Sequence, residues 1–158
     1  MNSPHDRKSV CIAPLGPEHA EALSSLIQRL QGSYCEAISA SAKTGWIAGG
    51  FIGDRLHGFL EIHSLDDPHL WRASVLIEPD WRGLGLGTGL LQAAIAFAKA
   101  SGRTTLRLAF QRHDWRMRKL VSKADARLDI VLGDLSADIS LLAKLSGSHL
   151  HQKGQHHD

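Results

Sequence analysis

The sequence has few cysteines and no long apolar run. Two isolated thiols, Cys11 and Cys35, cannot build a disulfide framework, so we expect a reducing compartment and thiols that are buried or unreactive. No apolar stretch reaches the roughly 18 residues that a membrane-spanning helix needs. The polar start MNSPHDRKS lacks the apolar core of a signal peptide. We therefore expect a cytoplasmic protein with no membrane segment.

Aromatic residues are also scarce, at 6% of the chain. The net charge is only +2, but residues 1–80 carry 6 Lys or Arg against 10 Asp or Glu, and residues 81–158 carry 12 against 6. The basic second half suits an anionic partner or is simply a solvated face. Nucleic-acid binding is poorly supported because no aromatic residues are interleaved with the basic ones. The four tryptophans are expected to be packing residues: Trp46, Trp71, Trp81 and Trp115.

What is present favours one globular domain in 158 residues, with 43% hydrophobic and 22% charged residues. We expect this domain over 9–145, a disordered N-terminus over 1–8 and a disordered His-rich tail over 146–158. The tail histidines have no helix or strand to fix a ligand geometry, so no metal site is expected there.

Hydrophobic periodicity and turn residues predict the order of the elements. Strands joined by both hairpins and a helical crossover imply an α/β fold, with one mixed, mostly antiparallel sheet of about six to seven strands flanked by helices. For residues 33–45 the pattern does not decide between a loop and a short helix. We expect single strands at 9–15, 70–78 and 104–110, and two hairpins at 46–65 and 127–142. We expect three helices, from Pro17 to Gly32, over 88–102 and from Asp114 to about Lys123.

The stretch WRGLGLGTG, residues 81–89, holds four of the fifteen glycines. It lies between an expected strand and an expected helix, where free helix N–H groups and close backbone approach make an anion site. It lacks the Lys of a P-loop, and no register gives the glycine spacing of the Rossmann fingerprint. The pattern R-x-x-G-x-G does match, from Arg82 to Gly87.

That pattern, with its surroundings, resembles the GNAT superfamily of N-acetyltransferases. VLIEPDWRGLGLGTGLLQAAIAFAKASG resembles the strand, loop and helix of the family core, and LRLAF the next strand. DWRMRKLVSKADARL resembles the family's following helix, with Asp114 in place of the usual Asn. The likeness is clear over 70–130 and looser from residue 9. The glycine loop and the final hairpin resemble those of protein-lysine acetyltransferase domains. It implies the GNAT fold and acetyl transfer from acetyl-CoA to an amine, either a small molecule or a protein amino group.

The resemblance also implies which residues bind acetyl-CoA. Backbone N–H groups of the glycine loop would bind the pyrophosphate, the end of the strand before it would pair with the pantetheine amides, and the start of the later helix would lie beside the pantetheine arm. Arg112, Arg116 and Arg118 either reach the 3′-phosphate or are surface residues. The implied binding residues are Leu76, Ile77, Arg82, Gly83, Leu84, Gly85, Leu86, Gly87, Thr88, Asp114 and Met117.

The residues for proton transfer depart from the family pattern. Val121 stands where a Tyr often serves as the acid, and the only tyrosine, Tyr34, lies in the unassigned segment. Trp71 and Arg72 stand where several members carry a Glu base.

Glu61 and His63 are the nearest alternatives, because their i, i+2 spacing places both on one face of a strand. Glu61 is the preferred candidate base. For His63 an ordinary outward-facing position is favoured over a catalytic one.

Two rivals to an acetyltransferase stay open. One is a GNAT-fold module that binds acyl-CoA without efficient chemistry, which the departures at Val121 and Trp71 motivate. The other is a basic nucleic-acid-binding domain that uses the positive half of the chain. The sequence does not name the acceptor, and it allows a homodimer as well as a monomer.

Overall fold

The computed structural model describes residues 9–30, 43–64, 67–110, 114–124, 126–131 and 133–142. The two segments expected to be disordered, 1–8 and 146–158, lie outside the described residues. So do Tyr34, Cys35 and Arg112.

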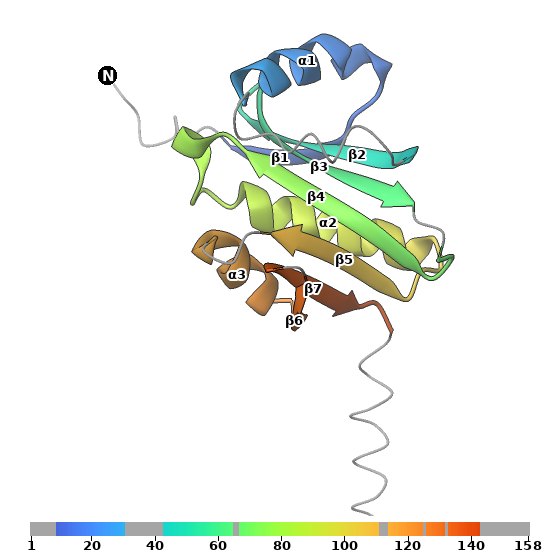
Figure 1. The fold of residues 1–158 in the computed structure, drawn as a ribbon. Helices are drawn as coiled ribbons and strands as arrows, with labels where there is room; N and C mark the ends of the chain where they lie inside the picture. The colour runs from blue at the N-terminus through green and yellow to red at the C-terminus, as the bar shows by residue number, and fades with distance from the viewer. Residues whose placement is uncertain are drawn as a thin grey trace, which may run out of the picture.

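Seven strands form one sheet in the order β1-β2-β3-β4-β5-β7-β6 (Figure 1). β4 and β5 are parallel, and every other neighbouring pair is antiparallel. This confirms the predicted mixed, mostly antiparallel sheet. The strands are β1 (Val10–Pro14), β2 (Lys43–Ile52), β3 (Arg55–Ser64), β4 (Leu70–Ile77), β5 (Thr105–Phe110), β6 (Arg127–Val131) and β7 (Asp134–Ser140).

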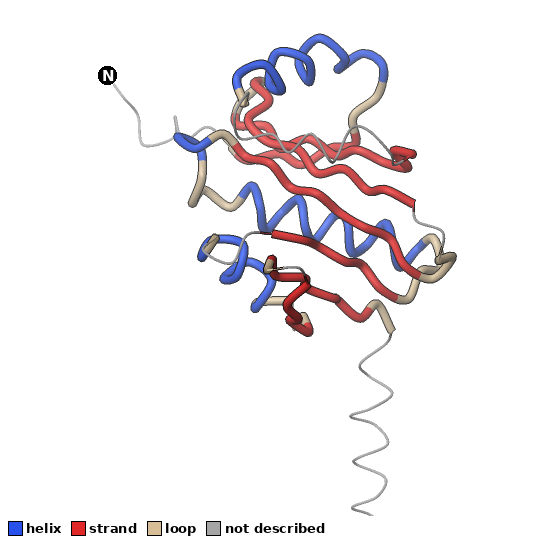
Figure 2. Tube along the Cα trace, in the orientation of Figure 1, coloured by secondary structure: helices blue, strands red, loops and turns tan. Residues whose placement is uncertain are grey.

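Helices cover both faces of the sheet (Figure 2). They are α1 (Ala20–Arg29), α2 (Leu86–Ala100) and α3 (Trp115–Ser122), with short 3-10 helices η1 (Pro17–His19) and η3 (Pro79–Trp81). Several predicted boundaries were wrong by two or three residues, among them the beginnings of β2 and α2. β2 begins at Lys43 rather than 46, because residues 43 and 44 still pair with β3. α2 begins at Leu86 rather than 88, because Leu86 is only 1% exposed and its packing draws it into the first turn.

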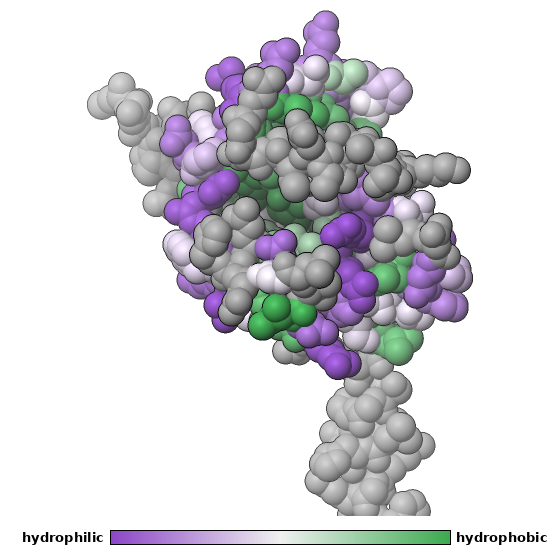
Figure 3. All heavy atoms as spheres, viewed as in Figure 1, coloured by the Kyte–Doolittle hydropathy of each residue, from purple (hydrophilic) through white to green (hydrophobic). Residues whose placement is uncertain are grey.

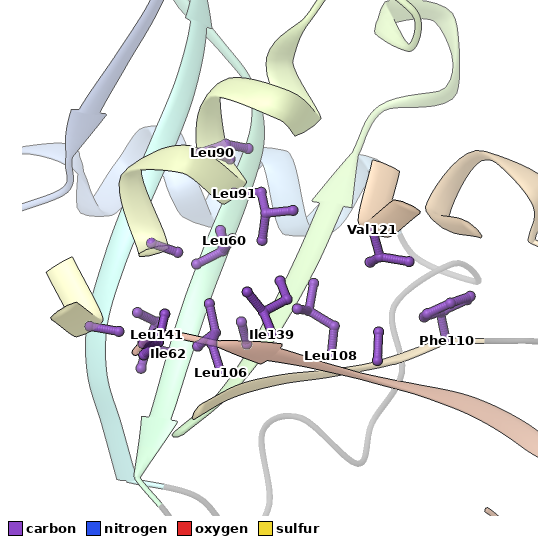
Figure 4. Close-up of a cluster of buried hydrophobic side chains, with 14 of the residues drawn as sticks. Leu60, Ile62, Leu90, Leu91, Leu106, Leu108, Phe110, Val121, Ile139 and Leu141 are labelled. Carbon is purple, nitrogen blue, oxygen red and sulfur yellow. The ribbon is translucent and has the colours of Figure 1, made fainter. Parts of the chain in front are cut away.

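The main core lies between the sheet and α2 (Figure 4). Side chains alternate along β3, so Leu60 and Ile62 face α2. Val121 of α3 is completely buried in the same cluster. Trp46 stacks on Phe97 of α2, with ring centroids 4.6 Å apart. We call this side of the sheet the α2 face.

The other side, which we call the α1 face, carries a smaller core. Leu26 and Leu30 at the end of α1 pack against Leu56 and Phe59, and Leu76 of β4 borders them. α1 covers this end of the sheet, and the polar residues of β3 and β4 continue the same face beyond it.

For two single side chains the expected burial was wrong, while the alternative for Cys11, an unreactive thiol, stays a prediction. Cys11 is a free, exposed cysteine, because it lies on the outer strand β1 and points away from the α2 core. Trp115 is 62% exposed, because it is the first residue of α3 and lies on a different side of the helix from the buried Val121. Among the described residues, no helix combines the length and apolar character that a membrane crossing needs.

Candidate active site

The two parallel strands in the middle of the sheet separate towards their carboxyl ends. β4 and β5 pair only from Leu70 with Thr105 to Ala73 with Leu108. Leu76 and Ile77 lie beyond the last pair and are bonded on their other side to β3. Figure 1 shows the two arrowheads apart, with the beginning of α2 behind the opening. Beyond the last pair, backbone N–H and C=O groups on the β5 side of β4 are therefore free to form hydrogen bonds with an extended ligand.

The glycine loop crosses from the end of β4 to α2 and leaves helix N–H groups unused. Gly83 and Gly85 have φ values of 80° and 93°, which only glycine adopts readily. The first bond of the helix runs from Gly89 N–H to Gly85 O at 3.0 Å, so the N–H groups of residues 86–88 precede the helical ladder. No side chain caps this end and no acidic residue lies in its first turn. Positive potential at the helix start is therefore not neutralised locally.

The glycines of the loop differ in the space around them. A Cβ at Gly83 or Gly85 would meet no heavy atom within 4 Å, so the backbone faces open space. Gly87 is different: a Cβ there would lie 3.2 Å from Ile77 Cδ1 and 3.5 Å from Leu120 Cδ2. The loop therefore presents its first two glycines outward and packs the third against the end of β4 and against α3.

Two further implied binding residues have local structural roles. Arg82 donates from Nε to Ile77 O at 3.2 Å and so ties the loop to the end of β4. Asp114 caps α3, because its carboxylate accepts from Met117 N–H at 3.1 Å. An Asp performs this capping as well as the Asn of the family pattern. Arg116 and Arg118 are exposed on α3.

A carboxylate before the loop connects it to α1. Arg29 Nη2 and Nε donate to Glu78 Oε1 at 2.8 and 3.2 Å, and Arg29 Nη2 also reaches Leu56 O at 3.0 Å. His57 Nδ1 lies 3.0 Å from the same oxygen, and its ring stacks on Trp81 with centroids 3.8 Å apart. Sequence reasoning missed this cluster. The signal available was only that Glu78 directly precedes the proline of the family lead-in.

Glu78→Gln is expected to lower the free energy of unfolding at pH 7 by roughly 1–2 kcal/mol, since the charge-assisted bonds to a partly exposed Arg29 are lost. Burial alone raises the pKa of Glu78, but the hydrogen bonds from Arg29 and His57 outweigh it, so the pKa lies below its ordinary value of 4.5. A depressed pKa stabilises the fold above that ordinary value, and the contribution is lost as the pH falls through the folded value.

Urea denaturation at pH 7 and below pH 4 measures this effect. Wild type and Glu78→Gln should converge in acid, whereas Glu18→Gln, at an exposed glutamate, should match wild type at both pH values. Equal stability of wild type and Glu78→Gln at pH 7 would contradict the role of the cluster.

Glu61 and His63 lie together on the α1 face of β3. They are 8% and 2% exposed, and His63 Nε2 lies 3.3 Å from Glu61 Oε2. The outward-facing position favoured for His63 was therefore wrong, because the face is covered there. Burial raises the pKa of Glu61. Burial, and then the positive charge of Arg72, lower the pKa of His63. The pair therefore favours a neutral imidazole beside a carboxyl whose pKa has moved towards neutrality.

These side chains lie near the opening between β4 and β5. Glu61 is the register partner of Ser74, the first β4 residue after the ladder with β5 ends. Figure 3 looks onto this face and shows hydrophilic residues beside apolar ones over the middle strands. A carboxyl at this position can act on a group that approaches the opening from the α1 face.

Of the three positions that break the family pattern for proton transfer, Val121 and Trp71 have packing roles and Arg72 is exposed. Val121 is completely buried against the α2 core. Trp71 stacks on Phe97 at 5.6 Å, and the Arg103 guanidinium lies 4.6 Å above its ring. Neither position provides a proton donor or acceptor. In the described part of the chain, no group of His, Cys, Asp and Glu could hold a metal ion.

Val121→Ala should therefore act through packing and lower the free energy of unfolding by about 2 kcal/mol, for two buried carbons and the cavity they leave. The matched control is Val10→Ala, which removes the same atoms at a 42% exposed position and should change stability little. Urea denaturation measures the loss of stability, and acetyl-CoA binding shows whether the donor site is intact. A selective loss of turnover in Val121→Ala with unchanged stability would contradict a packing role.

Comparison with known proteins agrees with this geometry. Residues 15–123 match the family model described as Acetyltransferase (GNAT) family. The chain belongs to the GNAT acetyltransferase family. GNAT acetyltransferases use acetyl-CoA, and the free N–H groups and open glycines of the loop suit its pyrophosphate. No curated protein matches the chain.

Solved GNAT structures share the acyl-CoA N-acyltransferase fold. The N-acetyltransferase from Staphylococcus aureus Mu50 has a TM-score of 0.70 at 17% identity, over 85% of this chain and 99% of that one. The ribosomal-protein-S18-alanine N-acetyltransferase from Escherichia coli has a TM-score of 0.68 at 15% identity, over 85% and 96%. YncA from Salmonella typhimurium, solved with its cofactor acetyl-CoA, has a TM-score of 0.66 at 14% identity, over 84% and 94%.

Proposed function

We propose that this GNAT protein is a cytoplasmic N-acetyltransferase that moves the acetyl group of acetyl-CoA directly to an amine, with Glu61 as the general base. The observation that carries the proposal is the buried Glu61 carboxyl, with its raised pKa, beside the point where β4 leaves β5. A raised pKa brings a carboxylate closer to the basicity that proton abstraction at neutral pH needs.

The donor is proposed to lie along the opening between the two strands. Backbone N–H groups from Gly83 to Thr88 bind the pyrophosphate, and main-chain groups of Leu76 and Ile77 pair with the pantetheine amides. Met117 and Asp114, at the beginning of α3, lie beside the pantetheine arm. This arrangement places the thioester near Ser74, within reach of an acceptor on the α1 face.

The reaction then proceeds by direct attack. The acceptor arrives as an ammonium ion, and Glu61 accepts one of its protons. The nitrogen lone pair attacks the thioester carbonyl carbon, the C–S bond breaks, and the electron pair leaves on the CoA sulfur. The nitrogen loses a second proton to water as the amide forms, and water in turn gives a proton to the thiolate, because Val121 offers no acid. The products are an amide, CoA thiol and a proton that Glu61 returns to solvent.

The test is release of CoA thiol from acetyl-CoA across a panel of amines, run beside a thermal-shift measurement. A ligand that binds only the folded state raises the melting temperature. We expect both a shift with acetyl-CoA and amine-dependent thiol release. A melting temperature that does not change at millimolar acetyl-CoA would overturn the proposal.

A binding module without chemistry is the second candidate, and the packing roles of Val121 and Trp71 favour it. It predicts the same thermal shift with no thiol release for any amine. Thioester turnover therefore separates the two functions.

A further inference from the structure

Four polar side chains form a block on the α1 face. Glu61 and His63 alternate on β3, and their register partners on β4 are Ser74 and Arg72. Directly opposed residues of antiparallel strands have Cβ atoms about 5 Å apart. The block therefore runs from Glu61 and Ser74, beside the opening between β4 and β5, back to His63 and Arg72.

His63 lacks the partners that its burial demands. Its ring is 2% exposed, and within the described part of the chain neither Nδ1 nor Nε2 makes a hydrogen bond. The 3.3 Å approach to Glu61 does not have hydrogen-bond geometry. Buried polar atoms are nearly always hydrogen-bonded, so an unpartnered imidazole indicates a missing partner. A neutral imidazole can offer that partner one N–H donor.

Arg72 supplies a positive charge at the same end of the block. Its register partner on β5 is Arg107, so two guanidinium groups occur on neighbouring strands. Arg107 is held by Asp138, with Nε to Oδ1 at 2.7 Å and Nη2 to Oδ2 at 2.9 Å. Arg72 is exposed and forms no ion pair with any residue that the structure describes. Asp138 therefore compensates the charge of Arg107, whereas an anion beside Arg72 would be its first described partner.

We propose that the acceptor carries a carboxylate joined to its amine by a short carbon link, as in a free amino acid. Its amine lies at Glu61, and Arg72 and His63 bind its carboxylate. The inference rests on the proposed function and names its substrate class.

The order of the residues along the strands gives the acceptor its direction. Glu61 lies opposite the first β4 residue after the ladder, where the thioester is proposed to lie. Arg72 lies within the ladder, where β5 is still paired and no donor can enter. The reacting nitrogen therefore points into the opening and the carboxylate points away from it. A peptide N-terminus carries a neutral amide in place of this carboxylate, and a lysine side chain carries methylene groups there, so neither brings an anion to Arg72 and His63.

The experiment compares amino acids with their own amides in the thiol-release assay. Glycine and β-alanine should have kcat/KM values above those of glycinamide and β-alaninamide by roughly 10- to 100-fold, as expected for a charge-assisted bond to a carboxylate. Each rate is referred to the concentration of the protonated amine, the form in which the acceptor is proposed to bind, since the acids and amides differ in amine pKa.

Variants of two arginines test where the carboxylate binds. Arg72→Gln should raise KM for the acids by the same factor, leave kcat nearly unchanged and leave the amides unaffected. Arg55→Gln, at an exposed arginine beside the β2–β3 turn, should keep the wild-type preference. Equal rates for acids and amides, or equal loss for both in Arg72→Gln, would overturn the inference and leave the acetyltransferase proposal standing.

A binding measurement keeps the inference testable without turnover. N-acetylglycine should raise the melting temperature of wild type more than N-acetylglycinamide does, and Arg72→Gln should remove the difference. If no amine is acetylated, the proposed function fails. If the two N-acetyl compounds then also give equal shifts, the carboxylate site fails separately.

Discussion

Glu61→Gln is expected to lower turnover at neutral pH by roughly 10²- to 10⁴-fold, the usual contribution of a general base, and to leave acetyl-CoA affinity unchanged. Because burial raises the pKa of Glu61, wild-type kcat/KM should rise with pH on an acidic limb above the ordinary carboxyl range. The variant should lack that limb. It should recover part of its rate at high pH, where more of the amine is already unprotonated.

Stability separates this loss from misfolding. A carboxyl whose folded pKa is raised favours folding at low pH, and that contribution is lost as the pH rises from its ordinary value through the folded one. Removing the buried charge should therefore make Glu61→Gln at least as stable as wild type at pH 7. Glu21→Gln, at an exposed glutamate of α1, is the matched control for activity and stability. Near wild-type turnover in Glu61→Gln would place the base elsewhere, with His63 the next candidate.

Gly85→Glu is expected to abolish the melting-temperature rise that acetyl-CoA produces. The new side chain would occupy the open space beside the free N–H groups and bring a negative charge to the pyrophosphate. At a ligand concentration 100 times Kd the lost stabilisation is about 2.7 kcal/mol, measured as the difference between scans with and without acetyl-CoA.

Gly102→Glu controls for backbone strain. Gly102 also has a positive φ, 78°, and open space around its Cβ position, but it follows the other end of α2. Both variants should melt lower than wild type without ligand, because a side chain at positive φ is strained. Only Gly102→Glu should keep the shift with acetyl-CoA. A wild-type shift in Gly85→Glu would show that the pyrophosphate binds elsewhere.

The sequence predicts the scaffold well because its signals are local. Glycine spacing, a strand ending at Pro79 and an apolar stripe from Leu90 to Ala98 depend on neighbouring residues, and the structure has the expected strand, loop and helix there. The boundary of α2 was missed because burial of Leu86 against distant strands, rather than local propensity, extends the helix.

The site residues were harder to predict because their environment comes from other strands. The alternation on β3 placed Glu61 and His63 on one face, but their burial depends on what lies over that face. In the sequence, Arg72 is only a departure from the family pattern. The register of β3 and β4 places it opposite His63. The link between Arg29 and Glu78 joins residues 49 positions apart, and no local pattern reveals it.

The Glu78 carboxylate is shared between the helix of the α1 face and the segment that enters the glycine loop. Any ligand that displaces α1 must change the same contacts that fix the entry to the loop. Acetyl-CoA and an acceptor that moves α1 would therefore not need to touch in order to influence each other's affinity. By thermodynamic reciprocity, whatever an acceptor does to acetyl-CoA affinity through this carboxylate, acetyl-CoA does equally to the acceptor.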